Sequence, residues 1–253
     1  MFILFALVLM RVTGGIAMNP VLGRTNFPNV AKGALIFMLS VLVYAGTDGT
    51  LAQEPAGMLD FGVMLIKEFM VGFVMGYSME LSFAIIRFGS AIIDHTMGLS
   101  MAQTYDPQYG SQMTITSNLY YAFLVTMFLA LDGHVRLLSI LFTSARLIPF
   151  GEVTVRPELS EFMLEVFRNS IAMGLQFAFP IIAMELVAEA AIGILMRVIP
   201  QINVFAVNFQ MKIIVGMMLL VFLFNPMSAQ LYTIIDDMLA NIENALVMLI
   251  PGV

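Results

Sequence analysis

The sequence predicts an all-α protein whose apolar helices are covered partly by lipid and partly by other subunits. Hydrophobic residues make up 60% of the 253 positions, and the mean hydropathy is +0.94. Charged residues make up only 11%, less than half of the roughly 25% that is usual in soluble domains. The period-two alternation of strands is absent, and backbone groups in lipid need partners within their own segment. The apolar runs are therefore expected to be helices.

Ionisable side chains interrupt almost every apolar run. They are Arg11, Lys67, Glu68, Arg87, Asp94, Glu185, Glu189, Arg197 and Lys212. Such a side chain costs about 2.5–3.5 kcal/mol at a bilayer centre unless it is paired, solvated or facing protein. We therefore expect a multi-subunit membrane assembly in which partner subunits cover the charged faces.

Several functional classes lack support in the sequence. The net charge of −6 is thinly spread and forms no basic stripe, so nucleic acid binding is not expected. There is no cysteine, and His95 and His134 have no ligand spacing around them, so no metal or other cofactor is predicted. No GxSxG, HExxH or phosphate-loop motif occurs, so catalysis is not predicted either. The first ten residues lack a basic n-region and are expected to be a retained helix.

The first third of the chain predicts three helices, over about 2–18, 30–45 and 59–78. Asn19-Pro20 ends the first, and a polar, Gly- and Pro-containing loop over 46–58 precedes the third. The third contains Gly72-xxx-Gly76, which permits close helix contact. The apolar character continues to Ile93.

Residues 94–118 form the longest stretch of mixed character. Gly98, Asp106-Pro107 and Gly110 interrupt any long helix there. Long irregular segments of this kind are usually functional or disordered, and the methionines and tyrosines here argue against disorder.

Further helices are expected over about 119–131 and 135–147, joined by a tight turn at Asp132-Gly133-His134. Pro157 suits the first turn of a helix continuing through Arg168. Apolar helices follow over about 169–197 and 204–224, with Pro200 between them. Asn225-Pro226 predicts an N-cap and first turn. The last helix is amphipathic, with an apolar stripe of Met227, Leu231, Ile234, Met238, Ile242, Leu246 and Leu249.

Glu185 and Glu189 are four residues apart and share a helix face. They could bind a proton or a cation, or they could face water or basic groups on a neighbour. The helix break at Pro200 resembles the broken helices that transporters place at binding sites. A secondary transporter that uses Glu185, Glu189 and this break is therefore an alternative function.

Five motifs, in the same order, resemble the FliR/SctT export-gate family of type III secretion. The pattern R-x-x-P-Q-x-N-x-F, followed by a lysine, is present as Arg197, Pro200, Gln201, Asn203, Phe205 and Lys212. The family's MGLS…DP loop corresponds to Met97–Ser100 and Asp106-Pro107, and its GGH-like turn to Asp132-Gly133-His134. The family's S-x-x-x-x-P-x-G motif corresponds to Ser144, Pro149 and Gly151. The arginine, glycine and prolines of its first helical hairpin correspond to Arg11, Gly15, Pro20 and Pro28.

This resemblance implies a non-enzymatic structural and gating subunit of a protein-export channel. It implies partners: several copies each of FliP-like and FliQ-like subunits, one FlhB-like subunit, membrane lipid, and unfolded export substrates in transit. Residues 1–165 would correspond to a FliP-like part and 166–253 to a FliQ-like part. The implied location is the bacterial inner membrane, at the base of the flagellum or of a related secretion apparatus, with the flagellar branch favoured.

The resemblance also assigns site residues. The plug that closes the pore would comprise Met97, Gly98, Leu99, Ser100, Met101, Ala102, Gln103, Thr104, Tyr105, Asp106 and Pro107. Where the family often has bulky aromatics after GLS, this chain has Met101 and Thr104, with Tyr105 nearby. Subunit contacts or structural motifs would involve Arg11, Pro20, Pro28, Gly72, Gly76, Gly133, His134, Pro149, Glu185, Glu189, Arg197, Pro200, Gln201, Asn203, Phe205 and Lys212.

Overall fold

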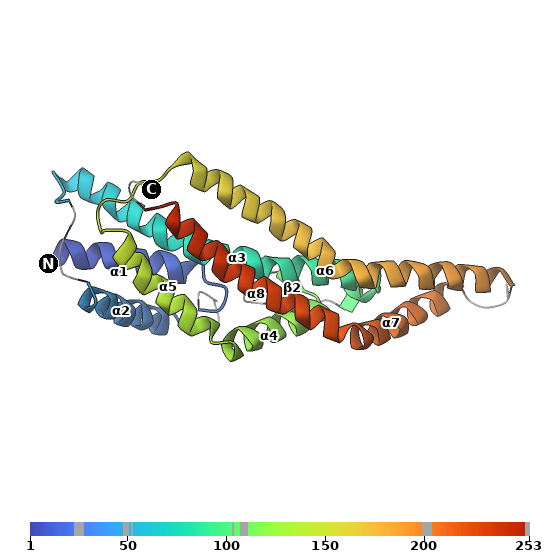
Figure 1. Cartoon of the computed structure of the whole chain (residues 1–253). Coiled ribbons are helices and arrows are strands. Elements are labelled where there is room, and N and C mark those ends of the chain that lie inside the picture. The colour runs from blue at the N-terminus through green and yellow to red at the C-terminus, as the bar shows by residue number, and fades with distance from the viewer. Residues whose placement is uncertain are drawn as a thin grey trace. The chain divides into compact units, whose positions relative to one another are not determined.

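The computed structural model describes residues 1–22, 28–47, 51, 53–102, 104–106, 111–198 and 204–250. Its helices are α1 (Phe2–Ala17), α2 (Asn29–Ala45), α3 (Met58–Thr96), α4 (Ile115–Ala130), α5 (Gly133–Leu147), α6 (Pro157–Val198), α7 (Val204–Phe222) and α8 (Phe224–Val247) (Figure 1). The predicted all-α class is confirmed. A 3₁₀ turn, Leu99–Ala102, and a short antiparallel pair, β1 (Thr104–Asp106) and β2 (Ser111–Met113), lie between α3 and α4.

The predicted ends of several helices agree with the structure to within a few residues. The first two helices agree to within one residue, and α6 begins at Pro157 as its first-turn proline predicts. The predicted apolar stripe is confirmed, because each of its seven residues is at most 3% exposed. Six of them lie on α8, and Leu249 lies in the turn that follows it. The irregular stretch is shorter than predicted, since α3 continues to Thr96 and α4 begins at Ile115.

The predicted ends near residues 78 and 168 are wrong, because α3 and α6 run on as single helices. In α3, the hydroxyl of Ser78 donates to the carbonyl of Val74 at 2.8 Å, so this serine bonds back onto its own helix instead of ending it. α6 continues through Pro180, which removes one backbone hydrogen bond at a typical cost of about 3 kcal/mol. Buried Phe177 and Ile181 flank that proline and offset its cost.

The predicted N-cap at Asn225 is also wrong, because α8 begins one residue earlier, at Phe224. The amide of Met227 donates to the carbonyl of Leu223 at 3.1 Å, which closes the first turn of α8. Pro226 thus lies in that first turn, where its missing N–H is not needed.

The chain forms two compact units. Unit 1 contains Met1–Ser82, Phe128–Arg168 and Ile235–Val253, and unit 2 contains Phe83–Met127 and Asn169–Ile234. The core of unit 1 includes Leu7, Val8, Val12, Val71, Ile148 and Leu239, and that of unit 2 includes Phe83, Ile86, Ile93, Tyr120, Leu124 and Phe177. In unit 2 the hydroxyl of Tyr120 donates to the sulfur of Met227, and its ring meets that of Phe177 edge-on, with 5.0 Å between centroids.

Two helical segments in the described part of the chain are long and apolar enough to cross a membrane, Met58–Thr96 and Pro157–Leu195. The count rises to four if the bent pairs α4–α5 and α7–α8 are each one span. In the apolar 18-residue stretch of α3 that could cross a membrane, 67% is buried within the protein. In the corresponding stretch of α6, only 22% is buried. The outer face of α6 therefore needs lipid or another subunit to cover it.

Candidate functional site

A buried ion pair joins α1 to α3 in unit 1. Nε of Arg11 donates to Oε2 of Glu68 at 2.7 Å, and both side chains are at most 1% exposed. Arg11 also donates to the carbonyls of Ser144 and Ile148, at 2.8 and 3.1 Å. The amide of Gly151 donates to the other carboxylate oxygen of Glu68 at 3.0 Å. The pair is therefore hydrogen-bonded on several sides, as a buried charge requires.

The segment that surrounds this ion pair is the S-x-x-x-x-P-x-G motif. Gly151 has φ of +92°, a conformation that side chains disfavour, and this turns its amide toward Glu68. The ring of Phe150 covers the guanidinium, with its centroid 4.1 Å from the central carbon. Pro149 lies exposed between the buried residues Ile148 and Phe150. The motif thus forms the docking site for Arg11 and Glu68.

The sequence leaves two roles open for Arg11, a subunit contact or a structural motif. In the structure Arg11 pairs with Glu68 of the same chain, and both side chains are buried. The signal that could have indicated Glu68 is its placement in the middle of an apolar helix, opposite in charge to Arg11.

The same two helices cross at glycines. A Cβ on Gly72 would overlap the carbonyl of Arg11 and lie 2.7 Å from the amide nitrogen of Gly15. A Cβ on Gly76 would lie 2.8 Å from the carbonyl oxygen of Gly15. Gly14 is equally close to the backbone of α3. Glycine on both helices lets the backbones touch, which places Arg11 within reach of Glu68.

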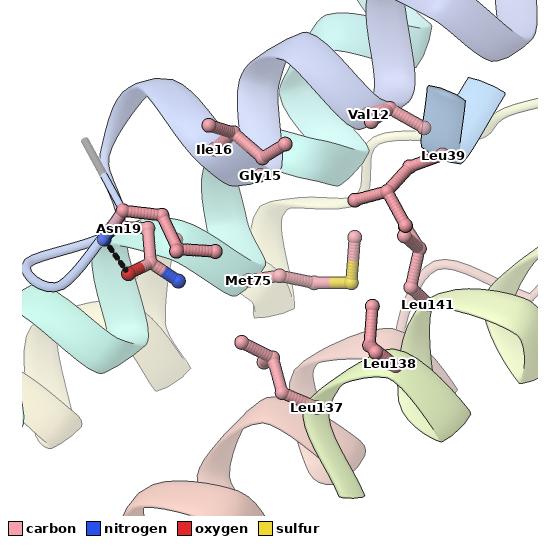
Figure 2. Close-up of a pocket in the computed structure, with 11 residues that line it drawn as sticks. Val12, Gly15, Ile16, Asn19, Leu39, Met75, Leu137, Leu138 and Leu141 are labelled. Atoms are coloured by element: carbon pink, nitrogen blue, oxygen red, sulfur yellow. Dashed lines mark hydrogen bonds between the residues drawn. The ribbon is translucent and has the colours of Figure 1, made fainter. Parts of the chain in front are cut away.

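A small apolar cavity lies beside this crossing, lined by residues of α1, α2, α3 and α5 (Figure 2). Its volume is about 40 Å³, and Met75 extends into it among the leucines of α2 and α5. Ligand pockets usually measure about 300–1,000 Å³, so this space is a packing defect and not a binding site. The buried Asn19 at its edge caps the turn after α1, accepting from the amides of Val21 and Leu22 at 2.9 Å. The next residue, Pro20, is buried in this turn, whereas Pro28 is exposed just before α2.

In unit 2, contacts at the end of α3 and at the start of α4 hold the two sides of the segment that contains the predicted plug. At its start, Met97 is fully buried, and Gly98 ends α3 with φ of +77° while its amide donates to the carbonyl of His95. Across the loop, buried Asp94 accepts from the amide of Thr116 at 2.9 Å and from its hydroxyl. Asp94 thereby caps the first turn of α4 from the last turn of α3.

In the rest of the predicted plug, Leu99 and Ser100 are half-buried, and Met101, Ala102 and Thr104–Asp106 are described by their backbone alone. Leu99–Ala102 form the 3₁₀ turn, and Thr104–Asp106 form β1, paired in register with β2. Gln103 and Pro107 lie outside the described residues. The sequence did not indicate the capping role of Asp94.

The predicted carboxylate pair lies on α6 in unit 2. Glu189 forms an ion pair with Lys212 of α7, with 2.9 Å between Oε1 and Nζ. Glu185 is 1% exposed, and neither of its carboxylate oxygens has a hydrogen-bond partner among the described residues. An ideal Cβ on Gly216 of α7 would lie 2.8 Å from Oε1 of Glu185 and 2.6 Å from Cγ of Met97. This glycine therefore makes room for both side chains.

The remaining residues of the predicted site lie in α5, α6 and α7 or outside the described part of the chain. Arg197 is exposed near the end of α6. Pro200, Gln201 and Asn203 lie outside the described residues, and Phe205 is described by its backbone alone, in α7. Gly133 is packed against the ring of Phe128 at the start of α5, and His134 next to it is exposed. The tight turn predicted there has Asp132 at φ of +55°, with its carbonyl accepting from the amides of Val135 and Arg136.

Comparison with known proteins adds the decisive observation. The family model described as "Bacterial export proteins, family 1" matches residues 2–238. The chain belongs to this family of bacterial export proteins. It is similar to the flagellar biosynthetic protein FliR of Pectobacterium carotovorum, at 31% identity over 92% of this chain and 89% of the relative. It is 27% identical to FliR of Escherichia coli K12, over 94% and 92%, and 25% identical to the surface presentation of antigens protein SpaR of Salmonella typhimurium, over 78% and 75%.

Membership in bacterial export proteins, family 1, confirms the resemblance found in the motifs. As a member of this family the chain is a non-enzymatic, membrane-associated component of a flagellar, type III protein-export apparatus.

Proposed function

We propose that this chain is the structural and gating subunit that completes a protein-export pore with several FliP-like and FliQ-like subunits. It lies in the bacterial inner membrane at the flagellar base, with an FlhB-like subunit at the pore entrance, and unfolded export substrates pass through. The observation that carries the assembly proposal is the apolar outer face of α6, where Phe179 is 66% and Val187 66% exposed. A surface this apolar is a subunit or lipid contact. Family membership favours this function over a solitary secondary transporter built on Glu185 and Glu189.

The division of the chain belongs to the same proposal. Residues 1–165 would take the place of a FliP-like subunit in the pore wall and 166–253 that of a FliQ-like subunit. Co-purification tests the assembly: the tagged chain should recover both kinds of subunit in fixed excess, as measured by the mass of the intact detergent-extracted complex. Recovery of the chain alone would contradict the proposal.

The loop between α3 and α4 is proposed to be the plug of the pore. This proposal is supported by the contacts on both sides of the loop: Met97 is buried, and Asp94 caps the first turn of α4 through Thr116. The described residues between these contacts lie outside the α-helices. Replacing residues 99–113 with a flexible Gly-Ser segment of equal length retains these fastenings. We expect such cells to leak small solutes across the inner membrane, as measured by uptake of a normally excluded dye, while the complex still assembles.

The control for the plug replacement is a Gly-Ser segment in the connection between α2 and α3, residues 46–57. It changes a loop of similar length and should leave dye uptake at the wild-type level. Unchanged permeability in the plug variant, with assembly intact, would refute the plug assignment.

Arg197 is proposed to contact a neighbouring subunit, because it is exposed near the end of the apolar helix α6. Truncating one partner of an interfacial charge pair typically costs about 2–5 kcal/mol. We expect Arg197→Ala to reduce co-purification of the FliQ-like subunits by more than tenfold. Arg146→Ala, which removes an exposed arginine in the last turn of α5, is the matched control and should have little effect. Equal recovery with both variants would leave Arg197 outside the interface.

A further inference from the structure

Glu185 is a buried carboxylate without a partner in unit 2. Its side chain is 1% exposed, and neither oxygen accepts a hydrogen bond within the described residues. An ionised carboxylate in this position would lack both hydration and hydrogen bonds, which costs several kcal/mol. A buried carboxyl group escapes most of that cost by holding a proton.

The charges around Glu185 are unequal in number. The charged groups that face it in the described part of the chain are Lys212 of α7 and Glu189 of α6. Lys212 already pairs with Glu189 at 2.9 Å, and that pair is half-exposed. Two carboxylates thus share one ammonium group, and the arrangement is neutral only when one of the carboxylates carries a proton. The more deeply buried one, Glu185, is the better site for it.

Gly216 connects this site to the start of the loop between α3 and α4. The atoms nearest to the position of a Cβ on Gly216 are Cε and Cγ of Met97 and Oε1 of Glu185. Met97 therefore packs in the gap beside the carboxyl group and is fully buried there. An ionised Glu185 needs water or a displaced Lys212 beside it, and both compete with the Met97 side chain for this space.

We propose that Glu185 is a proton-binding site and that its proton keeps Met97 seated between α6 and α7. On deprotonation the carboxyl O–H bond breaks and the proton passes to water. Lys212 keeps its own protons and turns from Glu189 toward Glu185, and the seat of Met97 loosens. The first half of the proposal concerns proton binding alone; the second half, in which loosening opens a pore, rests on the proposed function of the loop.

Infrared difference spectroscopy of the purified export complex, compared between acidic and alkaline buffer, tests the proton site. We expect the carbonyl stretching band of a protonated carboxylic acid, shifted by deuterium, in the wild type and its loss in Glu185→Gln. Glu161→Gln, at an exposed carboxylate of α6 in unit 1, should leave the band unchanged. Absence of the band in the wild type, or its persistence in Glu185→Gln, would overturn the proposal. If the wild-type band is absent in sodium buffer but present in sodium-free buffer, the site binds sodium instead of a proton.

Two neighbouring variants separate this site from a merely structural carboxyl group. Glu189→Gln releases Lys212 to Glu185, so the band should disappear at a lower pH than in the wild type. Lys212→Met removes the cation, so the band should persist to a higher pH. If neither substitution moves the pH at which the band disappears, the shared-cation arrangement is wrong.

Leakage across pH tests the coupling to Met97. We expect dye entry into proteoliposomes that contain the wild-type complex to rise as the pH is raised, and Glu185→Gln, which mimics the protonated group, to abolish that rise. A rise that survives in Glu185→Gln would overturn the coupling. If the variant with the Gly-Ser segment at residues 99–113 does not leak, the proposed plug function is wrong. The proton site is then still tested independently by the infrared band.

Discussion

Replacing Glu68 by glutamine is expected to lower the free energy of unfolding by about 3–5 kcal/mol, because it leaves Arg11 charged, buried and without its counter-ion. Glutamine has nearly the same shape, so the loss reports the charge and not a cavity. The guanidinium would keep its bonds to the carbonyls of Ser144 and Ile148, but two carbonyls cannot neutralise it. Unfolding in mixed detergent micelles, followed by far-ultraviolet circular dichroism, measures the change.

Two comparisons show whether this loss comes from the pair. Glu161→Gln removes an exposed carboxylate in the same unit and is expected to change the unfolding midpoint little. The double variant Arg11→Met with Glu68→Leu replaces both charges with apolar groups and should be more stable than Glu68→Gln alone. A Glu68→Gln protein that unfolds like the wild type would show that the ion pair contributes nothing.

Replacing Gly72 by alanine is expected to destabilise the chain by more than the 1–3 kcal/mol that is typical of overpacking. The added methyl would overlap the backbone carbonyl of Arg11, and a backbone cannot swing aside as a flexible side chain can. α1 and α3 would have to separate, which also lengthens the Arg11–Glu68 pair. The same micelle titration measures this variant.

The same substitution elsewhere in α3 has the opposite expected sign. Apart from its chain neighbours and the nearby backbone of α3, no atom of the described residues lies within 4 Å of the Cβ position on Gly62. Alanine there gains helix propensity without a clash, so Gly62→Ala should stabilise the chain by up to about 1 kcal/mol. Destabilisation by both substitutions to a similar degree would rule out the crossing as the cause.

Local periodicity in the sequence is enough to predict much of the fold. The stripe from Met227 to Leu249 could be predicted because a helix repeats its buried face every three or four residues. Pro157 could be predicted because a first-turn proline sacrifices no hydrogen bond. The helix predicted over 169–197 runs on through Pro180, where the burial of Phe177 and Ile181 offsets the lost hydrogen bond.

The partners of the charged residues could not be predicted in this way. Arg11 and Glu68 are 57 residues apart. Gly72 and Gly76 indicate that α3 packs closely against another helix, but the sequence does not indicate that this helix is α1. The shared face of Glu185 and Glu189 was visible in their spacing, but which of the two meets Lys212 depends on how α6 and α7 pack. Pairing across sequence distance is a property of tertiary structure, and one sequence contains no direct signal of it.

The guanidinium of Arg11 has a consequence for the order of biosynthesis. Its acceptors lie 57, 133 and 137 residues further along the chain, so the first helix leaves the ribosome long before they exist. Until residue 148 has been synthesised, the guanidinium lacks part of this set of acceptors, and an unsatisfied cation is costly in apolar surroundings. The newborn chain therefore depends on water, lipid headgroups or an insertion chaperone until Ser144 and Ile148 have been translated.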